Sequence, residues 1–253
     1  MKKIIHLTDT HLGHENLSSI MRNLVSRIIF TKQNSSNYVI VITGDIVEDA
    51  TDDGSFEEAM THFNRLKDAG FTVLFVPGNH DYGTGIIASH KYVNKFKKHF
   101  FGTEDVIYPI KTIVDDIAFI GLDSMAEEIN WYDRLSSEGE LGQEQLERLD
   151  YMLTNDTEVL NAQYRVVYLH HHPFHPKIFN QLKDSKELGG ILTGKNISAL
   201  LFGHNHDGRI WNGVWGIPRV YDGGTSTSKD GSPNPHRVID LSKDPIFDYD
   251  AKF

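Results

Sequence analysis

The 253-residue sequence contains no cysteine, and this absence removes several classes of chemistry at once. Thiolate zinc sites, iron–sulfur clusters, disulfide frameworks and cysteine nucleophiles all require that side chain. A chain of this length can bury enough apolar surface to fold without disulfide bonds. Any metal site must therefore be built from histidine, carboxylate and carbonyl groups.

Long apolar runs are also missing. The first nine residues, MKKIIHLTD, contain two lysines but too short an apolar run for a signal peptide. No other stretch approaches the roughly 20 apolar residues of a membrane-spanning helix. The formal net charge of −10 disfavours adhesion to nucleic acid or to an anionic membrane. These features predict a soluble, cytoplasmic protein with neither a membrane nor a nucleic acid as partner.

Short β-rich runs alternate with segments of helical period. Six runs are apolar enough at consecutive positions to be strands covered on both faces, at residues 3–8, 38–43, 72–76, 118–122, 165–169 and 198–202. Amphipathic stripes between them, such as Leu17, Ile20, Leu24 and Ile28, indicate an α/β fold of layered sheets and helices. Hairpins or edge strands are expected beyond residue 203. Because no repeat or linker interrupts the chain, residues 1–253 are expected to form one domain.

Carboxylate, amide and imidazole side chains follow five of the six predicted strands. They are Asp9 and His11, then Asp45, then Asn79 and His80, then the three histidines 170–172, and finally His204 and His206. Ligand sites of open α/β sheets lie outside the carboxyl ends of the strands. We therefore expect these side chains to meet at one rim of the fold.

The chemistry of this set is that of a metal site. Imidazole and carboxylate are ordinary ligands of Zn, Fe and Mn, a carboxylate can bridge two ions, and an asparagine adds a neutral oxygen. Any one Asp-x-His or Gly-Asp pair is more often a turn or a helix cap. Five strand ends that all carry such residues favour metal binding. Seven ligands exceed what one tetrahedral ion can use, so the sequence predicts two divalent ions, as in two-metal hydrolases.

The order of the motifs resembles that of a known family. Asp-x-His, Gly-Asp, Gly-Asn-His-Asp, His-x-Pro and Gly-His-x-His follow one another across residues 9–206, as in the calcineurin-like metallophosphoesterases. The resemblance implies a four-layer αββα sandwich that carries a binuclear metal centre. The stretch GLDS at 121–124, followed by an amphipathic segment after residue 139, is similar to bacterial class III cyclic-nucleotide and glycerophosphodiester phosphodiesterases.

The resemblance also implies a ligand set. One ion would be held by Asp9, His11, Asp45 and His206, and the other by Asp45, Asn79, His171 and His204, with Asp45 as the bridge. Among the three adjacent histidines, the family pattern places the ligand two residues before Pro173, which is His171. His170 is then expected to face the opposite side of the strand, and His172 to contact the substrate.

His80 is not a ligand in this pattern. It is similar to the residue that contacts the phosphate, together with Asn79, and protonates the leaving oxygen. Relatives often orient this histidine with an aspartate three residues beyond the bridging one. Here that position is Glu48, which is the expected catalytic partner, with Asp49 beside it as the alternative. Asp81 is expected to anchor its loop.

The resemblance and the ligand set together predict a metal-dependent phosphoesterase. A hydroxide that bridges two ions (Mn, Fe or Zn) would attack phosphorus in line with the leaving group. The expected substrate is a small phosphodiester, such as a cyclic nucleotide or a glycerophosphodiester. A phosphomonoesterase, a nuclease and a non-catalytic scaffold of the same fold are the alternatives, and a homodimer is the oligomer that the resemblance suggests.

Overall fold

The computed structural model describes residues 2–14, 16–85, 88–126, 138–175, 181–227 and 235–251. Its strands are β1 (Lys3–Leu7), β2 (Tyr38–Thr43), β3 (Thr72–Val76), β4 (Ile110–Val114), β5 (Ile117–Gly121), β6 (Tyr164–Tyr168), β7 (Ala199–Phe202), β8 (Ile210–Trp211), β9 (Val220–Asp222), β10 (His236–Ile239) and β11 (Tyr249–Ala251). Its α-helices are α1 (Leu17–Thr31), α2 (Asp53–Asp68), α3 (His90–Phe101), α4 (Gln143–Asn155), α5 (Thr157–Asn161) and α6 (Ser185–Leu192). Short 3₁₀ turns occur at η1 (Ser35–Asn37), η2 (His80–Tyr82) and η4 (Pro245–Phe247).

The strands form two mixed sheets. The first has the order β11-β10-β1-β2-β3, in which β1, β2 and β3 are parallel and β10 and β11 are antiparallel to their neighbours. The second has the order β4-β5-β6-β7-β9-β8, with β5, β6, β7 and β9 parallel and one antiparallel strand at each edge. Parallel strands require crossover connections, and the helices supply them.

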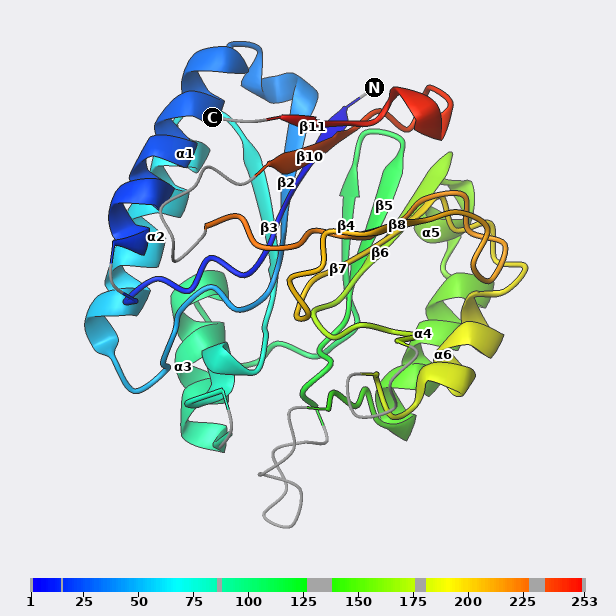
Figure 1. The fold of residues 1–253 in the computed structure, drawn as a ribbon. Coiled ribbons are helices and arrows are strands. Elements are labelled where there is room, and N and C mark those ends of the chain that lie inside the picture. Colours follow the sequence, from blue (N-terminus) through cyan, green and yellow to red (C-terminus); the bar gives the residue numbers. More distant parts are fainter. Residues whose placement is uncertain are drawn as a thin grey trace.

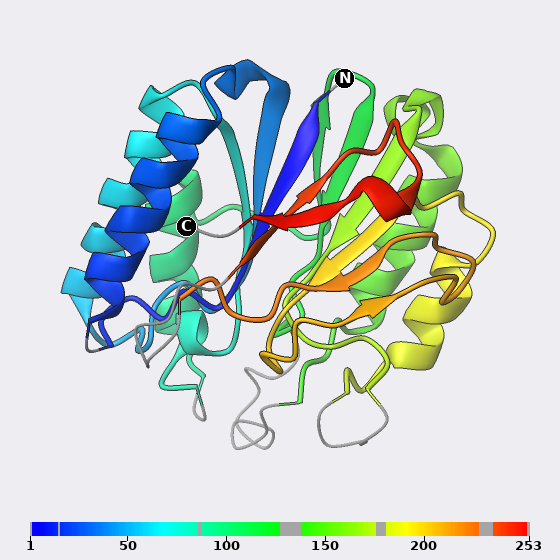
Figure 2. The same cartoon turned by 45° about the horizontal axis from the view of Figure 1, so that its top comes forward.

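The two sheets face each other and helices cover both outer faces (Figure 1 and Figure 2). Helices α1, α2 and α3 pack on the first sheet through an apolar core that includes Met21, Phe56 and Phe96. Helices α4 and α6 pack on the second sheet through Leu149 and Leu188, among others. A third core fills the space between the sheets. The predicted four-layer αββα sandwich is confirmed.

The six predicted strands all form, with bounds that shift by one residue at most. Three further strands, β4, β9 and β11, were not predicted, and the first two show why. β4 has a lysine at its second position and an exposed isoleucine at its fourth, so its pattern lacks the run of a buried strand. β9 is only three residues long, which is too short to show a periodic pattern in the sequence. Part of the long segment 123–142, residues 127–137, lies outside the described residues.

Candidate metal centre

Five residues of the predicted site adopt left-handed backbone conformations. Their φ angles are 50° at Asp9, 44° at His11, 48° at Asp45, 76° at His204 and 57° at His206. Such a conformation is uncommon for a residue with a side chain and costs roughly 1 to 3 kcal/mol at each position. Strain of this kind is concentrated at functional sites, where the surrounding structure holds it. The chain therefore turns sharply beyond β1, β2 and β7.

The first group of donor atoms comes from the loops after β1 and β7. Nε2 of His206 lies 3.0 Å from Oδ1 of Asp9 and 3.3 Å from Nε2 of His11. Nε2 of His11 is 3.9 Å from Oδ1 of Asp9 and 3.9 Å from Oδ2 of Asp45. Donor atoms of Asp9, His11 and His206 all lie within 4.8 Å of one another, close enough to share one ion. The prediction that these side chains meet is confirmed.

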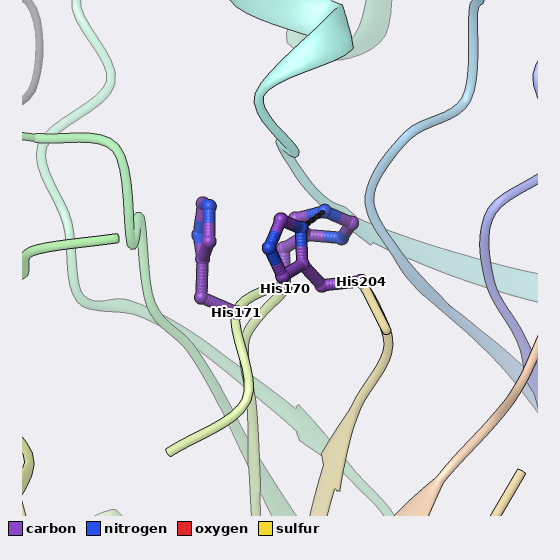
Figure 3. Close-up of side chains that lie close together, drawn as sticks. All are labelled: His170, His171 and His204. Carbon is purple, nitrogen blue, oxygen red and sulfur yellow. Dashed lines mark hydrogen bonds between the residues drawn. The ribbon is translucent and has the colours of Figure 1, made fainter. Parts of the chain in front are cut away.

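The second group surrounds the imidazole of His170. Its Nε2 lies 3.2 Å from Oδ2 of Asp45, 3.1 Å from Oδ1 of Asn79 and 3.3 Å from Nδ1 of His204. Figure 3 labels His170, His171 and His204, whose ring centroids lie 5.0 Å (His170–His171), 5.1 Å (His170–His204) and 4.4 Å (His171–His204) apart. Asp45 contacts both groups, because the same Oδ2 atom also lies 3.9 Å from His11. The carboxylate of Asp45 therefore lies between the two groups of donor atoms.

The placement of His170 corrects one expectation. We expected this residue to face the opposite side of the strand, but its ring points at Asp45 and Asn79. β6 ends at Tyr168, so the strict alternation of a strand does not extend to residue 170. Nδ1 of His170 donates to the backbone carbonyl of Thr43 at 2.7 Å, and this bond turns Nε2 toward the centre.

His171 lies beside the second group, whereas His172 points elsewhere. Nδ1 of His171 is hydrogen-bonded to the hydroxyl of Ser124 at 2.8 Å, and donor atoms of His171, His170 and His204 lie close enough to form one group. His172 is fully buried among aromatic rings, with its centroid 4.7 Å from that of Phe202 and 5.1 Å from that of Trp211. This burial does not favour the predicted contact between His172 and a substrate.

Glu48 contacts two site histidines in different ways. Its carboxylate oxygen Oε2 lies 2.8 Å from Nδ1 of His11, whereas its backbone carbonyl accepts a 2.6 Å hydrogen bond from Nδ1 of His80. We expected the side chain of Glu48 to orient His80; the main chain has that role instead. Gly85 covers the His80 ring, since a Cβ atom there would lie 2.5 Å from Nε2 of His80.

The charges of the centre are strongly coupled. Burial alone would raise the pKa of the Asp45 carboxyl, but the neighbouring His170, His80 and His11 hold it well below its usual range. Burial lowers the pKa of His170, yet the carboxylates of Asp45 and Asp9 outweigh it and raise the value to about 9. Burial lowers the pKa of His204 to about 4, helped by the charge of His170. A divalent cation would compete with protons for these imidazoles and carboxylates.

The donor set fits divalent metal ions. Histidine ligands of metals usually donate their other ring N–H to a carboxylate or a carbonyl, which fixes the ligating nitrogen. His11 does so toward Glu48 and His170 toward the carbonyl of Thr43. The amide of Asn79 donates to the carbonyl of Gly85 at 3.0 Å, which leaves its oxygen turned toward His170. Nitrogen and oxygen donors in this arrangement suit Zn, Fe or Mn.

Two supporting residues were missed by sequence reasoning. The hydroxyl of Thr8 donates to Oδ2 of Asp9 at 2.5 Å, and Ser124 bonds His171. Thr8 ends the first predicted strand and Ser124 belongs to the GLDS stretch. Adjacency to a predicted ligand was the only available signal for Thr8.

Comparisons with known proteins agree with this geometry. The chain is 28% identical over 228 residues to the 3′,5′-cyclic adenosine monophosphate phosphodiesterase CpdA of Haemophilus influenzae, covering 83% of this chain and 73% of that protein. In fold it is similar to TT1561 of Thermus thermophilus, with a TM-score of 0.59, 11% identity and coverage of 99% and 98% of the two chains. It is also similar to GAP50, the anchor in the inner membrane complex of Plasmodium, with a TM-score of 0.60, 12% identity and coverage of 100% and 89%.

Two further findings concern the chain as a whole. Among the described residues, no helix has the length and apolar character needed to cross a membrane. Residues 2–208 match the calcineurin-like phosphoesterase family, and this stretch contains every residue of the two donor groups. The chain therefore belongs to the calcineurin-like phosphoesterase family.

Proposed function

We propose that this chain hydrolyses small phosphodiesters at a centre of two divalent ions. The observation that carries the proposal is the position of Asp45, whose Oδ2 lies 3.9 Å from Nε2 of His11 and 3.2 Å from Nε2 of His170. A carboxylate between two sets of donors is suited to bridge two cations. Family membership supports a phosphoesterase, and the site supplies the residues for it.

Two ligand sets share Asp45 in this proposal. One ion is assigned to Asp9, His11, Asp45 and His206, and the other to Asp45, Asn79, His170 and His204. His170 takes the position that sequence reasoning gave to His171, because its Nε2 contacts both Asp45 and Asn79. His171 is the alternative ligand.

Bound divalent ions supply Lewis acidity to the phosphate oxygens and lower the pKa of coordinated water. Mn, Fe and Zn all suit this donor set. The protein's part is to hold the donors close together before any ion arrives, through hydrogen bonds such as that of His170 to Thr43.

His80 is assigned the role of general acid. Its Nδ1 donates to the carbonyl of Glu48, which fixes the ring and leaves Nε2 to hold the proton that the departing oxygen takes. Its backbone N–H also donates to Oδ1 of Asp45 at 3.0 Å, so the acid is tied to the bridging carboxylate. A positioned general acid contributes typically about 10²- to 10⁴-fold to the rate.

The substrate class rests on the relative in Haemophilus influenzae, which is named as a cyclic adenosine monophosphate phosphodiesterase. We propose a small diester, with cyclic nucleotides and glycerophosphodiesters as the two candidates. A diester carries one negative charge, shared by its two non-bridging oxygens, which two bound cations can neutralise.

A turnover panel tests the proposal. The chain is stripped with a chelator, reconstituted with Mn²⁺, and assayed on bis-p-nitrophenyl phosphate, p-nitrophenyl phosphate, cyclic AMP and glycerophosphocholine. We expect Mn²⁺-dependent turnover with preference for a diester, and loss of that turnover in Asp45→Asn. Preference for p-nitrophenyl phosphate would indicate a monoesterase, and inactivity on every ester with two ions bound would favour a scaffold.

A further inference from the structure

Asp81 is fully buried, and its carboxylate accepts three backbone hydrogen bonds. Oδ1 accepts from the N–H groups of Ile46 (2.9 Å) and Val47 (3.1 Å), and Oδ2 accepts from that of Gly78 (2.9 Å). Ile46 directly follows Asp45, and Gly78 directly precedes Asn79. One carboxylate therefore joins the loop that carries the candidate bridge to the loop that carries the asparagine donor.

The conformation of the loop that carries Asp45 explains why its backbone N–H groups need an acceptor. Gly44 and Asp45 both have positive φ angles, 84° and 48°. Turns of this kind can make successive backbone N–H groups converge and form a small anion-binding concavity. The N–H groups of Ile46 and Val47 converge in this way, and Oδ1 of Asp81 supplies the acceptor for both.

The two loops are in direct contact, which makes their relative position sensitive. A Cβ atom on Gly78 would lie 2.2 Å from Oδ1 of Asp45, and one on Gly44 would lie 2.7 Å from the nitrogen of Gly78. Oδ2 of Asp45 and Oδ1 of Asn79 lie 3.2 and 3.1 Å from the same nitrogen of His170. A small separation of the loops would pull these two oxygens apart.

We infer that Asp81 is a positioning residue of the metal centre, which fixes Asp45 and Asn79 at the separation that one ion requires. The inference rests on the proposed function for the identity of the centre. Asp81 acts through the backbone, because both of its oxygens are used by N–H groups of the two loops. Asp81→Asn would place an NH₂ donor against one of these backbone N–H groups, and the hydrogen bond to that loop would be lost.

A matched control is available on the other side of the molecule. Asp248 also has a buried side chain, and its two oxygens accept from Nε of Arg219 (2.8 Å), the hydroxyl of Tyr221 (2.7 Å) and the backbone N–H of Asp240 (2.9 Å). Asp248→Asn therefore disturbs a comparable network near the C-terminal strands. Both variants are expected to lower the melting temperature of the metal-free protein.

The test is a titration of the stripped full-length chain with Mn²⁺ alone, followed by calorimetry. We expect Asp81→Asn to bind Mn²⁺ about 10- to 100-fold more weakly than the wild type, the range measured for residues that support metal ligands. Asp248→Asn is expected to bind Mn²⁺ like the wild type. Equal Mn²⁺ affinity in Asp81→Asn and the wild type, with only a lower melting temperature, would overturn the inference.

A second pair keeps the test decisive where Asp81→Asn fails to fold. Asp81→Glu and Asp81→Gln have the same length and differ in one acceptor oxygen, so the Glu variant should bind Mn²⁺ more tightly. Equal affinities within this pair would overturn the inference. Because no substrate is present, the outcome is separate from that of the proposed function: a wild type that binds Mn²⁺ but hydrolyses no ester would reject only the latter.

Discussion

The carboxylate of Glu48 lies 2.8 Å from Nδ1 of His11. The backbone carbonyl of the same residue accepts a hydrogen bond from Nδ1 of His80 at 2.6 Å. Glu48 thus fixes the ring of a candidate ligand through its side chain and the ring of the candidate acid through its main chain. A substitution at residue 48 removes the first contact and leaves the second, so the two roles can be separated by experiment.

Glu48→Ala is expected to weaken metal binding without affecting the acid. Loss of the partner of Nδ1 frees the His11 ring to rotate, and we expect Mn²⁺ affinity to fall about 10- to 100-fold. At saturating Mn²⁺ the ratio of rates on aryl and alkyl diesters should stay unchanged, because the carbonyl still holds His80. Glu58→Ala is the control, since it removes a carboxylate 3.4 Å from Nε2 of His62 on α2. A changed ratio with unchanged affinity would contradict the assignment.

His80→Ala should leave metal content intact and slow the reaction. An alkoxide leaving group needs a proton more than a nitrophenolate does, so the alkyl diester should lose about 10²- to 10⁴-fold and bis-p-nitrophenyl phosphate much less. Rates at saturating Mn²⁺ on both esters, with metal content by mass spectrometry, measure the difference. Equal losses on the two esters would show that His80 is not the acid.

Of the three histidines that follow β6, His170 and His171 give opposite expectations. His170→Ala should reduce the bound metal from two ions to one, because its Nε2 contacts Asp45, Asn79 and His204. His171→Ala should retain both ions, because Nε2 of His170 stays against Asp45 and Asn79 in that variant. Metal analysis after reconstitution with Mn²⁺ decides between them, and the reverse result would restore the assignment made from the sequence.

Much of this fold could be predicted because each sheet is built around buried parallel strands, whose apolar runs are visible in the sequence. The αββα layers themselves came from the resemblance of the motifs. The strand ends then indicated the region of the site. Six of the expected side chains converge there: Asp9, His11, Asp45, Asn79, His204 and His206. That convergence depends on the packing of two sheets whose strands end on the same side, and on the turns that follow β1, β2 and β7.

The remaining features depend on the direction of individual side chains. Sequence spacing could not show that the chain leaves its strand geometry after Tyr168 and turns His170 into the centre. Nor could it show that Glu48 would give its carboxylate to His11, because that contact depends on the left-handed turn at Asp45. Nor could it show that His172 would be buried among aromatic rings, against Phe202 and Trp211.

The metal-free protein should lose stability as the pH falls, in part through His6. This residue is buried between neighbouring strands with Nε2 2.9 Å from Oγ1 of Thr43, and burial, with the charge of Arg237, lowers its pKa to about 3. The unfolded chain binds a proton at this histidine below about pH 6.5, whereas the folded chain does not until about pH 3. Stability is therefore full above pH 6.5 and falls toward pH 3, by up to about 1.4 kcal/mol per pH unit for this one group.

Urea unfolding in the presence of a chelator, at pH 7.0, 6.0, 5.0 and 4.5, measures this slope. His6→Gln retains an amide that can reach Thr43 and removes the titrating group. The slope of the unfolding free energy against pH should therefore be smaller than in the wild type by about the contribution of one bound proton. His90→Gln, at an exposed position at the start of α3, controls for the loss of a histidine as such. The same slope in His6→Gln and the wild type would show that His6 is not kept neutral by the fold.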